Sequence, residues 1–468
     1  MKICFTFLLT FLFHPVVTGK TYDILAYGAE ADGKTINTKA IQKAIDACTP
    51  GDTVYIQNGH YLTGTVHLKS NITLYISKEG FLIGSTNIND YEAYSNRPLM
   101  RYGMLVANNI INLNISGPGT IEANGSAFMN TPTLPRQIML FVGCRDITIQ
   151  NISALNIPFN GIEFRDCAKI KALNLKLWGS SINSGKGIDL YNCNNSHING
   201  CHIRSGQSAV AVSGLSGQIV INNSSLQSND NAISILSANS NSVKNVSVRH
   251  VNITKSGRGI YLSVSDSASL EDINFTDLSI ETKQHSGDSL LYGEPVYVSV
   301  SHNTDSAKSG TIKNISFDNI LCNAENQIML SGASTSLLQD VRFDNVVLNI
   351  HNPVITAKPT YIPASAVSAA YVSVLSISNI AVSWPVNQSQ AYIGNGIAVN
   401  NFKNFKLSNY SVTATGTNTH AVSLTDGDHA IVDAGDVFKL RVTEPKPIKV
   451  IPKAKTQKPA PAKTIARL

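Results

Sequence analysis

Apolar side chains recur through the middle of the chain in a short phrase that returns with small changes. Between Ile157 and Thr282 the phrase reads FNGIEF, GKGIDL, QSAVAV, DNAISI and GRGIYL. Its central apolar positions are separated by steps of 26, 22, 23 and 27 residues: Ile162, Ile188, Val210, Ile233 and Ile260. A repeat in the low twenties is typical of a solenoid, in which each unit packs on the next.

Each unit also contains runs in which apolar and polar residues alternate, such as residues 171–177, 218–221 and 246–253. Alternation with a period of two predicts strands, and none of these runs has helical spacing. A coil of short strands and turns cannot bury its apolar side alone. Coils stacked about 4.8 Å apart share one interior. We therefore predict an all-β fold, a right-handed single-stranded parallel β-helix.

The N-terminal region predicts a cap for this stack. Residues 22–28 are expected to form a strand, and residues 38–48 place Ala40, Ile41, Ala44 and Ile45 at helical spacing, with Asn37 or Thr38 as the N-cap. Such an amphipathic helix would cover the open end of the solenoid. Further strands are predicted at residues 53–56, 65–68, 72–76 and 81–83.

Beyond Thr282 the alternation continues in five longer runs, which predict further coils with longer turns, including one at residues 284–295. The runs are residues 311–321, 341–350, 371–382, 395–412 and 419–432.

Both ends of the chain differ from this pattern. Residues 1–19 combine a basic start with a short apolar run, which predicts a secretory signal peptide and hence an exported protein. Residues 437–468 are rich in Lys, Pro and Ala and are expected to form a disordered tail. The β-helix domain is then residues 20–436.

The net charge of +6 comes from the tail, which carries nine Lys or Arg and one Glu, a charge of +8, so that the rest of the chain sums to −2. The nearly neutral body gives no indication of nucleic-acid binding, whereas the tail could contact an anionic envelope or polysaccharide or simply be solvated. We expect a monomer.

Cysteine spacing gives no indication of a metal site, and we expect no cofactor. Cys144, Cys167 and Cys193 follow the repeated strand at steps of 23 and 26 residues, which predicts one column of buried thiols rather than disulfide bonds. Trp178 and Trp384 are expected to be packing residues, although a Trp side chain can also stack on sugars.

Several N-terminal motifs resemble glycoside hydrolase family 28, the polygalacturonases. They are AIDAC, GDTVYIQNGHYLTGTVHLKSNITLYI, LIGSTNINDY and ISGPGTIEANG, which ends at Gly125. The resemblance implies a pectin-lyase-like β-helix with a substrate groove along one face. It also implies hydrolysis of galacturonan-type polysaccharides by inversion, without a metal, so a polysaccharide that contains uronate is the expected partner.

The resemblance also implies four phrases on successive coils, and this chain departs from all of them. Asn-Thr-Asp-Gly falls on residues 183–187, with Asn183 kept and Lys186 in place of the Asp. Gly-Asp-Asp falls on residues 206–208, where Gln207 and Ser208 replace both acids. Gly-His-Gly falls on residues 230–232, around Asn231, and Arg-Ile-Lys on residues 259–261, which end at Tyr261. An oxocarbenium-like transition state needs a proton donor and a base, so the family's mechanism is expected to be lost.

A replacement site can be proposed from the strand alternation. Because Ile162 and Phe164 point inward, Glu163 and Arg165 point outward, and Asp189 lies one coil later. Glu163 and Asp189 would then be stacked carboxylates about 5 Å apart, closer to the separation of a retaining glycosidase. Residues expected to border this pair and to bind substrate are Lys186, Arg165, Arg204, Arg258, Tyr261, Asn183, Gln207 and Asn231.

Three functions remain open at this point. The first is an exported protein that binds a polysaccharide in the groove but has lost hydrolysis. The second is a carbohydrate hydrolase or lyase rebuilt around Glu163 and Asp189, although outward acids beside Arg165 and Lys186 also suit an ordinary salt-linked surface. The third is a structural or adhesive envelope protein.

Overall fold

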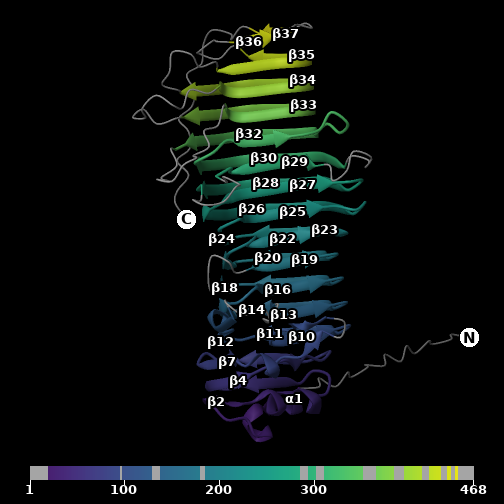
Figure 1. Cartoon of the computed structure of the whole chain (residues 1–468), viewed down its shortest axis with the longest axis vertical. Helices are drawn as coiled ribbons and strands as arrows, with labels where there is room; N and C mark the ends of the chain where they lie inside the picture. The colour runs from purple at the N-terminus through teal and green to yellow at the C-terminus, as the bar shows by residue number, and fades with distance from the viewer. Residues whose placement is uncertain are drawn as a thin grey trace, which may run out of the picture.

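The computed structural model describes eleven segments of the chain. They are residues 19–94, 97–128, 137–179, 185–284, 293–301, 310–351, 365–383, 395–413, 421–433, 440–443 and 448–451. Thirty-five strands within them join one continuous sheet. The strand pairs of that sheet are parallel and link successive coils, as β13, β16, β19 and β22 do. Figure 1 shows the coils stacked along one long axis. The prediction of a right-handed parallel β-helix is confirmed.

Three ladders of strands run along the stack, and we name them by their order within each coil. The first ladder contains β5 (Val66–His67), β10 (Leu105–Asn108), β13 (Gln137–Val142), β16 (Asn160–Arg165), β19 (Ile188–Tyr191), β22 (Val210–Ser213), β25 (Asn231–Ser237), β27 (Arg258–Ser265), β29 (Val296–Ser301) and β31 (Ile328–Ser331). The predicted column is confirmed, since Ile162, Ile188, Val210, Ile233 and Ile260 are register partners from coil to coil.

The second and third ladders complete each coil. The second contains β1 (Thr21–Asp23), β3 (Thr53–Ile56), β6 (Thr73–Ile76), β11 (Ile111–Ser116), β14 (Arg145–Gln150), β17 (Ala168–Leu173), β20 (Asn194–Asn199) and β23 (Ser216–Asn222). The third contains β2 (Asp32–Ile36), β4 (Gly59–Thr63), β7 (Gly80–Gly84), β12 (Thr120–Glu122), β15 (Ser153–Ile157), β18 (Lys176–Gly179), β21 (His202–Ser205) and β24 (Ser225–Ser228).

Toward the C-terminal end, second-ladder and third-ladder strands merge into longer ones. These are β26 (Ser242–Ser256), β28 (Ser269–Thr282), β30 (Thr311–Ala324) and β32 (Gln339–Ile350), followed by β33 (Ser365–Ser383), β34 (Asn395–Thr413) and β35 (Val422–Asp433). Strands β36 (Leu440–Thr443) and β37 (Ile448–Ile451) both pair with β35. The ladder therefore extends past residue 436, where the tail was expected to begin. Most of the predicted turn at residues 284–295 lies outside the described residues, and so does Trp384.

The N-terminal cap follows the sequence pattern with two differences. Helix α1 (Thr38–Ala47) buries the four predicted residues and lies at one end of the stack (Figure 1). Asn37 precedes it, but its side chain donates to Glu30 O, 3.0 Å away, instead of capping the helix. The strand expected at residues 22–28 is wrong beyond Asp23, because η1 (Ile24–Tyr27) follows. The Asp23 side chain accepts from Leu25 N and starts this turn.

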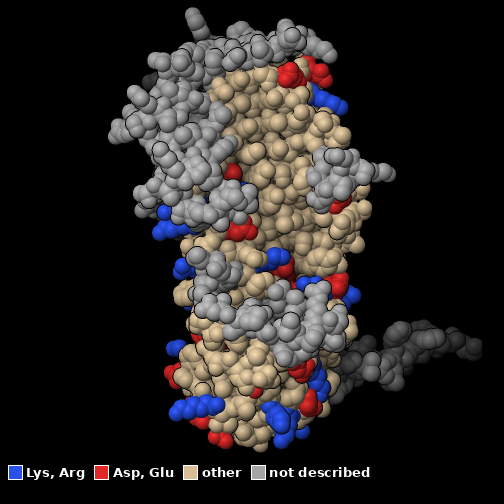
Figure 2. Space-filling view, in the orientation of Figure 1, with Lys and Arg blue, Asp and Glu red and all other residues tan. Residues whose placement is uncertain are grey.

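Three small elements lie beside the coils: η2 (Ile88–Asp90), η3 (Gly125–Phe128) and the antiparallel pair β8 (Ala93–Tyr94) and β9 (Arg97–Arg101). No helix in the described segments is long and apolar enough to cross a membrane. Figure 2 shows charges of both signs near the N-terminal end of the visible face and a mainly uncharged surface over the described coils above.

The interior is one continuous column of stacked side chains. Phe275, Phe317 and Phe343 occupy the same register position on β28, β30 and β32. Their ring centroids are 4.9 and 4.6 Å apart, with interplanar angles of 5° and 9°. The predicted thiol column is also confirmed, because Cys144, Cys167 and Cys193 are buried and free. The spacing between coils thus brings like residues into contact.

Replacing Phe317 by Ala is expected to lower the free energy of unfolding by about 3–5 kcal/mol, because a buried ring is removed from between two others. Guanidinium denaturation followed by far-UV circular dichroism measures this loss. The control is Lys313→Ala on the same strand, where the exposed side chain should contribute less than about 0.5 kcal/mol. An equal loss in both variants contradicts the packing argument.

Candidate functional site

The two carboxylates proposed from the sequence are brought together on the first ladder. Glu163 on β16 and Asp189 on β19 are register partners on neighbouring strands, so the predicted stacking is confirmed. The expected exposure is wrong, because Glu163 is 4% and Asp189 7% exposed. They point away from the core, yet neighbours in the same outward column, Leu140, Ala211 and Ser234, are also buried. This part of the outer face is covered.

Glu163 is held by two side chains. Arg165 Nε donates to Glu163 Oε1, and Asn160 Nδ2 donates to Oε2 over 3.3 Å. The Arg165 guanidinium carbon also lies 5.8 Å from the centre of the Tyr191 ring. Burying a carboxyl group costs free energy unless such partners compensate for the lost contacts with water. Sequence reasoning missed Asn160, although its place in the repeated phrase was an available signal.

Asp189 is less completely satisfied. Lys186 Nζ donates to Asp189 Oδ2 over 2.8 Å, whereas Oδ1 has no hydrogen-bond partner within the described segments. Burial raises the pKa of the Asp189 carboxyl; Lys186 opposes this rise and the Glu163 carboxylate adds to it. Lys186 N also donates to Asn160 Oδ1 over 3.0 Å, which links the two halves of the cluster.

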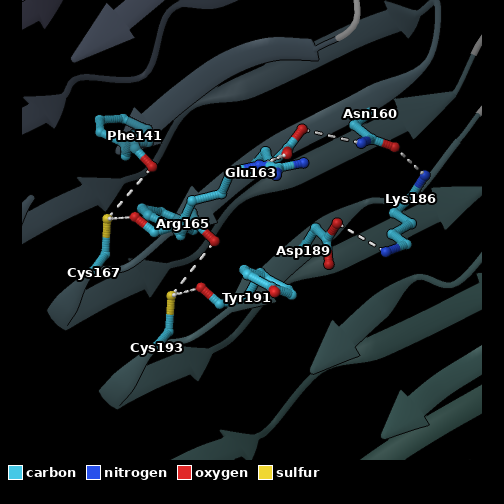
Figure 3. Close-up of polar contacts among 10 residues, drawn as sticks. Phe141, Asn160, Glu163, Arg165, Cys167, Lys186, Asp189, Tyr191 and Cys193 are labelled. Atoms are coloured by element: carbon cyan, nitrogen blue, oxygen red, sulfur yellow. Dashed lines mark hydrogen bonds and ion pairs between the residues drawn. The ribbon is translucent and has the colours of Figure 1, made fainter. Parts of the chain in front are cut away.

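Figure 3 shows this arrangement, with Asn160 between Glu163 and Lys186 and with Asp189 on the next strand. We call these five residues the acid–base cluster: Asn160, Glu163, Arg165, Lys186 and Asp189. Each carboxylate faces one cation, so the cluster is close to neutral. Chemically it could transfer a proton through Asp189, whose raised pKa and open oxygen are the features expected of a general acid.

Three other predicted residues form a second group further along the first ladder. Arg258 is buried, and its Nε lies 3.1 Å from Glu294 Oε2 while its Nη1 donates to Asn231 Oδ1 over 3.2 Å. Its guanidinium carbon is 5.0 Å from the Tyr261 ring centre and 4.8 Å from that of Tyr297. These contacts direct the Arg258 donors at protein groups rather than at solvent.

The remaining predicted residues do not join either group. Arg204 lies on β21 of the third ladder, so the expectation that it borders the Glu163 face is wrong. Gln207 is exposed in the turn after β21, and Asn183 lies outside the described residues. Trp178 on β18 is 52% exposed, so the expectation that it is a packing residue is also wrong.

The outward column of the first ladder carries no carboxylate on the described strands from β22 to β29. Its members there are Ala211, Ser234, Tyr261 and Tyr297. Nor do the described segments contain a group of three or more His, Cys, Asp or Glu side chains placed to hold a metal ion. On the described strands of the first ladder, Glu163 and Asp189 are thus the carboxylates of this outward column.

Several proteins similar in sequence to this chain have names that refer to galacturonides. The chain is 39% identical over 119 residues to an exo-poly-alpha-D-galacturonosidase of Dickeya chrysanthemi, covering 23% of this chain and 20% of that protein. It is 27% identical over 220 residues to a probable polygalacturonase of Vitis vinifera, covering 40% and 43%. The chain thus spans less than half the length of each of these two relatives.

Solved structures with the same fold have different descriptions. A family 28 exopolygalacturonase of Yersinia enterocolitica has a TM-score of 0.60 at 17% identity, covering 85% of this chain and 78% of that one. The surface protein and adhesin PfbA of Streptococcus pneumoniae has a TM-score of 0.58 at 15% identity, covering 86% and 99%. At such identities these similarities show the fold alone.

A family model described as glycosyl hydrolases family 28 matches residues 51–372, which is more than half of the chain. The matched range includes the acid–base cluster and every strand of the first ladder. This chain belongs to glycosyl hydrolases family 28.

Proposed function

We propose that this chain is an exported member of family 28 that binds a polysaccharide and has lost the family's hydrolytic reaction. The single observation that carries the proposal is the state of the two carboxylates. Glu163 and Asp189 are buried, and each is paired with a cation, Arg165 or Lys186. An inverting hydrolase needs one acid and one base that reach the substrate and a water from opposite sides.

The polysaccharide part of the proposal follows from the family and its relatives. Their names refer to galacturonan-type substrates, so a ligand rich in uronate is the first to test. Export is part of the proposal because such polymers lie outside cells. An adhesive role is compatible with the same fold, as the adhesin PfbA illustrates, and its test is release of the protein from cells after the tail is deleted.

A second candidate function is hydrolysis by a rebuilt centre, and one observation favours it. Asp189 combines a raised pKa with an oxygen that lacks a partner within the described segments. Neighbouring strands lie about 4.8 Å apart, which is the separation expected for the Cα atoms of Glu163 and Asp189. Side chains that extend side by side from these positions would place their carboxyl groups near the roughly 5–5.5 Å separation of retaining enzymes. Movement of Arg165 or Lys186 onto a uronate would free the pair.

Activity measurements separate these two candidates. The full chain is expected to release no reducing ends and no unsaturated products from polygalacturonate or from a panel of other polysaccharides, because neither carboxylate is available. Binding to the same panel, measured by affinity electrophoresis, is expected to persist.

If products do form, Glu163→Gln and Asp189→Asn decide their origin. A rebuilt centre predicts that each variant loses activity about 100-fold to 10,000-fold. Asp146→Asn, an outward acid on the second ladder, is the matched control and should keep it. If activity is present in the wild type, disappears in Glu163→Gln and Asp189→Asn, and remains in Asp146→Asn, the proposed loss of hydrolysis is wrong.

Stability should also depend on pH through Asp189. Because its pKa is higher in the folded protein than the unfolded value of about 3.9, the folded state binds the proton more tightly. The free energy of unfolding contributed by this group is therefore fully present below about pH 3.9 and is lost as pH rises through the folded pKa.

Asp189→Asn is expected to remove this decline in urea unfolding measured from pH 4 upward, while Asp146→Asn leaves it. An unchanged pH slope in Asp189→Asn would show that burial does not control this carboxyl.

A further inference from the structure

A groove of about 790 Å³ lies on the outer face of the third ladder, away from the acid–base cluster. It extends over β15, β18, β21, β24 and β26. The lining side chains that matter here are Lys176, Trp178, His202, Arg204, Gln227 and Thr254. None of the residues that line it in the described structure is acidic.

The register of the strands orders these side chains into two parallel rows. Trp178 pairs with Arg204, and Arg204 pairs with Gln227. Lys176 pairs with His202 in the second row. Successive members of a row are about 4.8 Å apart, so the rows present an aromatic ring, two cations and an amide along the axis of the stack.

The exposure of these groups distinguishes them from those of the first ladder. Trp178 is 52% exposed, and Lys176, His202 and Arg204 are exposed as well. Neither Lys176 nor Arg204 has an ion-pair partner in the described segments, whereas Arg165, Lys186 and Arg258 are each paired with a carboxylate. Exposed aromatic surface beside unpaired cations is typical of a binding site.

The hollow continues toward the C-terminal end of the stack. A second depression of about 430 Å³ shares Thr254 with the groove and is lined further on by Glu281, Lys283, Glu325 and His351. Together they form one strip over successive coils, which suits a linear polymer. The acids at the far end leave the Trp178 end as the more positive one, so charge complementarity selects an anionic occupant there.

We propose that this groove binds a segment of a polysaccharide that contains uronate. The indole of Trp178 stacks on the apolar face of one sugar ring, and Arg204 and Lys176 pair with carboxylates of neighbouring sugars. The inference rests on the proposed polysaccharide-binding function and extends it. It places the binding site on the third ladder and specifies a charged ligand.

Binding of polygalacturonate oligosaccharides to the full chain, measured by isothermal titration calorimetry, tests the proposal. Trp178→Ala and Arg204→Ala are each expected to raise the Kd about tenfold or more, and added salt should weaken binding. Two matched controls should change the Kd less than twofold: Leu215→Ala, a 56% exposed apolar residue elsewhere, and Lys244→Ala, an exposed cation on β26. Neutral dextran should not bind.

Fluorescence adds a readout that does not depend on deleting a side chain. The chain has two Trp residues, so in a Trp384→Phe background the emission comes from Trp178 alone. Stacking predicts a shift or quench of this emission with polygalacturonate but none with dextran.

The outcomes separate the two proposals. If polygalacturonate binds with the same Kd to wild type, Trp178→Ala and Arg204→Ala, and the Trp178 emission does not change, this groove is not the site, although the proposed function stands. If the full chain binds no polysaccharide of the panel, both proposals fail. If the full chain binds only the uncharged polysaccharides of the panel, the inference of a charged ligand fails and the proposed function stands.

Discussion

Every part of this molecule depends on one backbone constraint: each coil must turn through the same corner so that its strands meet those of the next coil in register. At one corner the left-handed conformation recurs at Asn151, Asn174, Gly200 and Asn223, with φ values of 60°, 53°, 67° and 48°. Gly and Asn adopt this conformation most readily, which explains why the chain is rich in Asn. Stacked amides then bond between coils, as Asn174 Nδ2 does with Asn151 Oδ1 over 3.2 Å.

The same register determines which outward side chains are neighbours, so side chains of like or opposite charge can lie next to each other on adjacent strands. It places the buried carboxylates of Glu163 and Asp189 on adjacent strands, where like charges repel. Arg165 and Lys186 offset this repulsion, and Asn160 joins the two pairs. Removing one cation alone would leave an unpaired buried charge, which is why the cluster acts as a unit. On the third ladder, by contrast, Lys176 and Arg204 remain in solvent with no such neighbour in the described segments.

The sequence predicts the interior better than the faces, for a physical reason. Core positions repeat, because each must fit the same residue one coil away, so the Ile162 column, the thiol column and the buried side of α1 follow from spacing alone. Burial of Glu163 depends instead on what covers an outward face, which alternation does not encode. The face on which Arg204 lies depends on how many strands make up one coil, and alternation within a single strand does not reveal that number.

The division between core and faces also explains how one fold can carry outer surfaces of different character. Outward residues contribute little to the packing that holds the coils together, so positions such as Ala211 and Ser234 can vary without disturbing the register of the inward column. On the first ladder the outer face is buried around Glu163 and Asp189, and this burial raises the pKa of the Asp189 carboxyl, which pairs with Lys186. Another face of the same stack keeps its exposed aromatic and basic side chains. The outer faces of two ladders can therefore differ in burial and charge, because strand alternation keeps their side chains out of the inward column that holds the coils together.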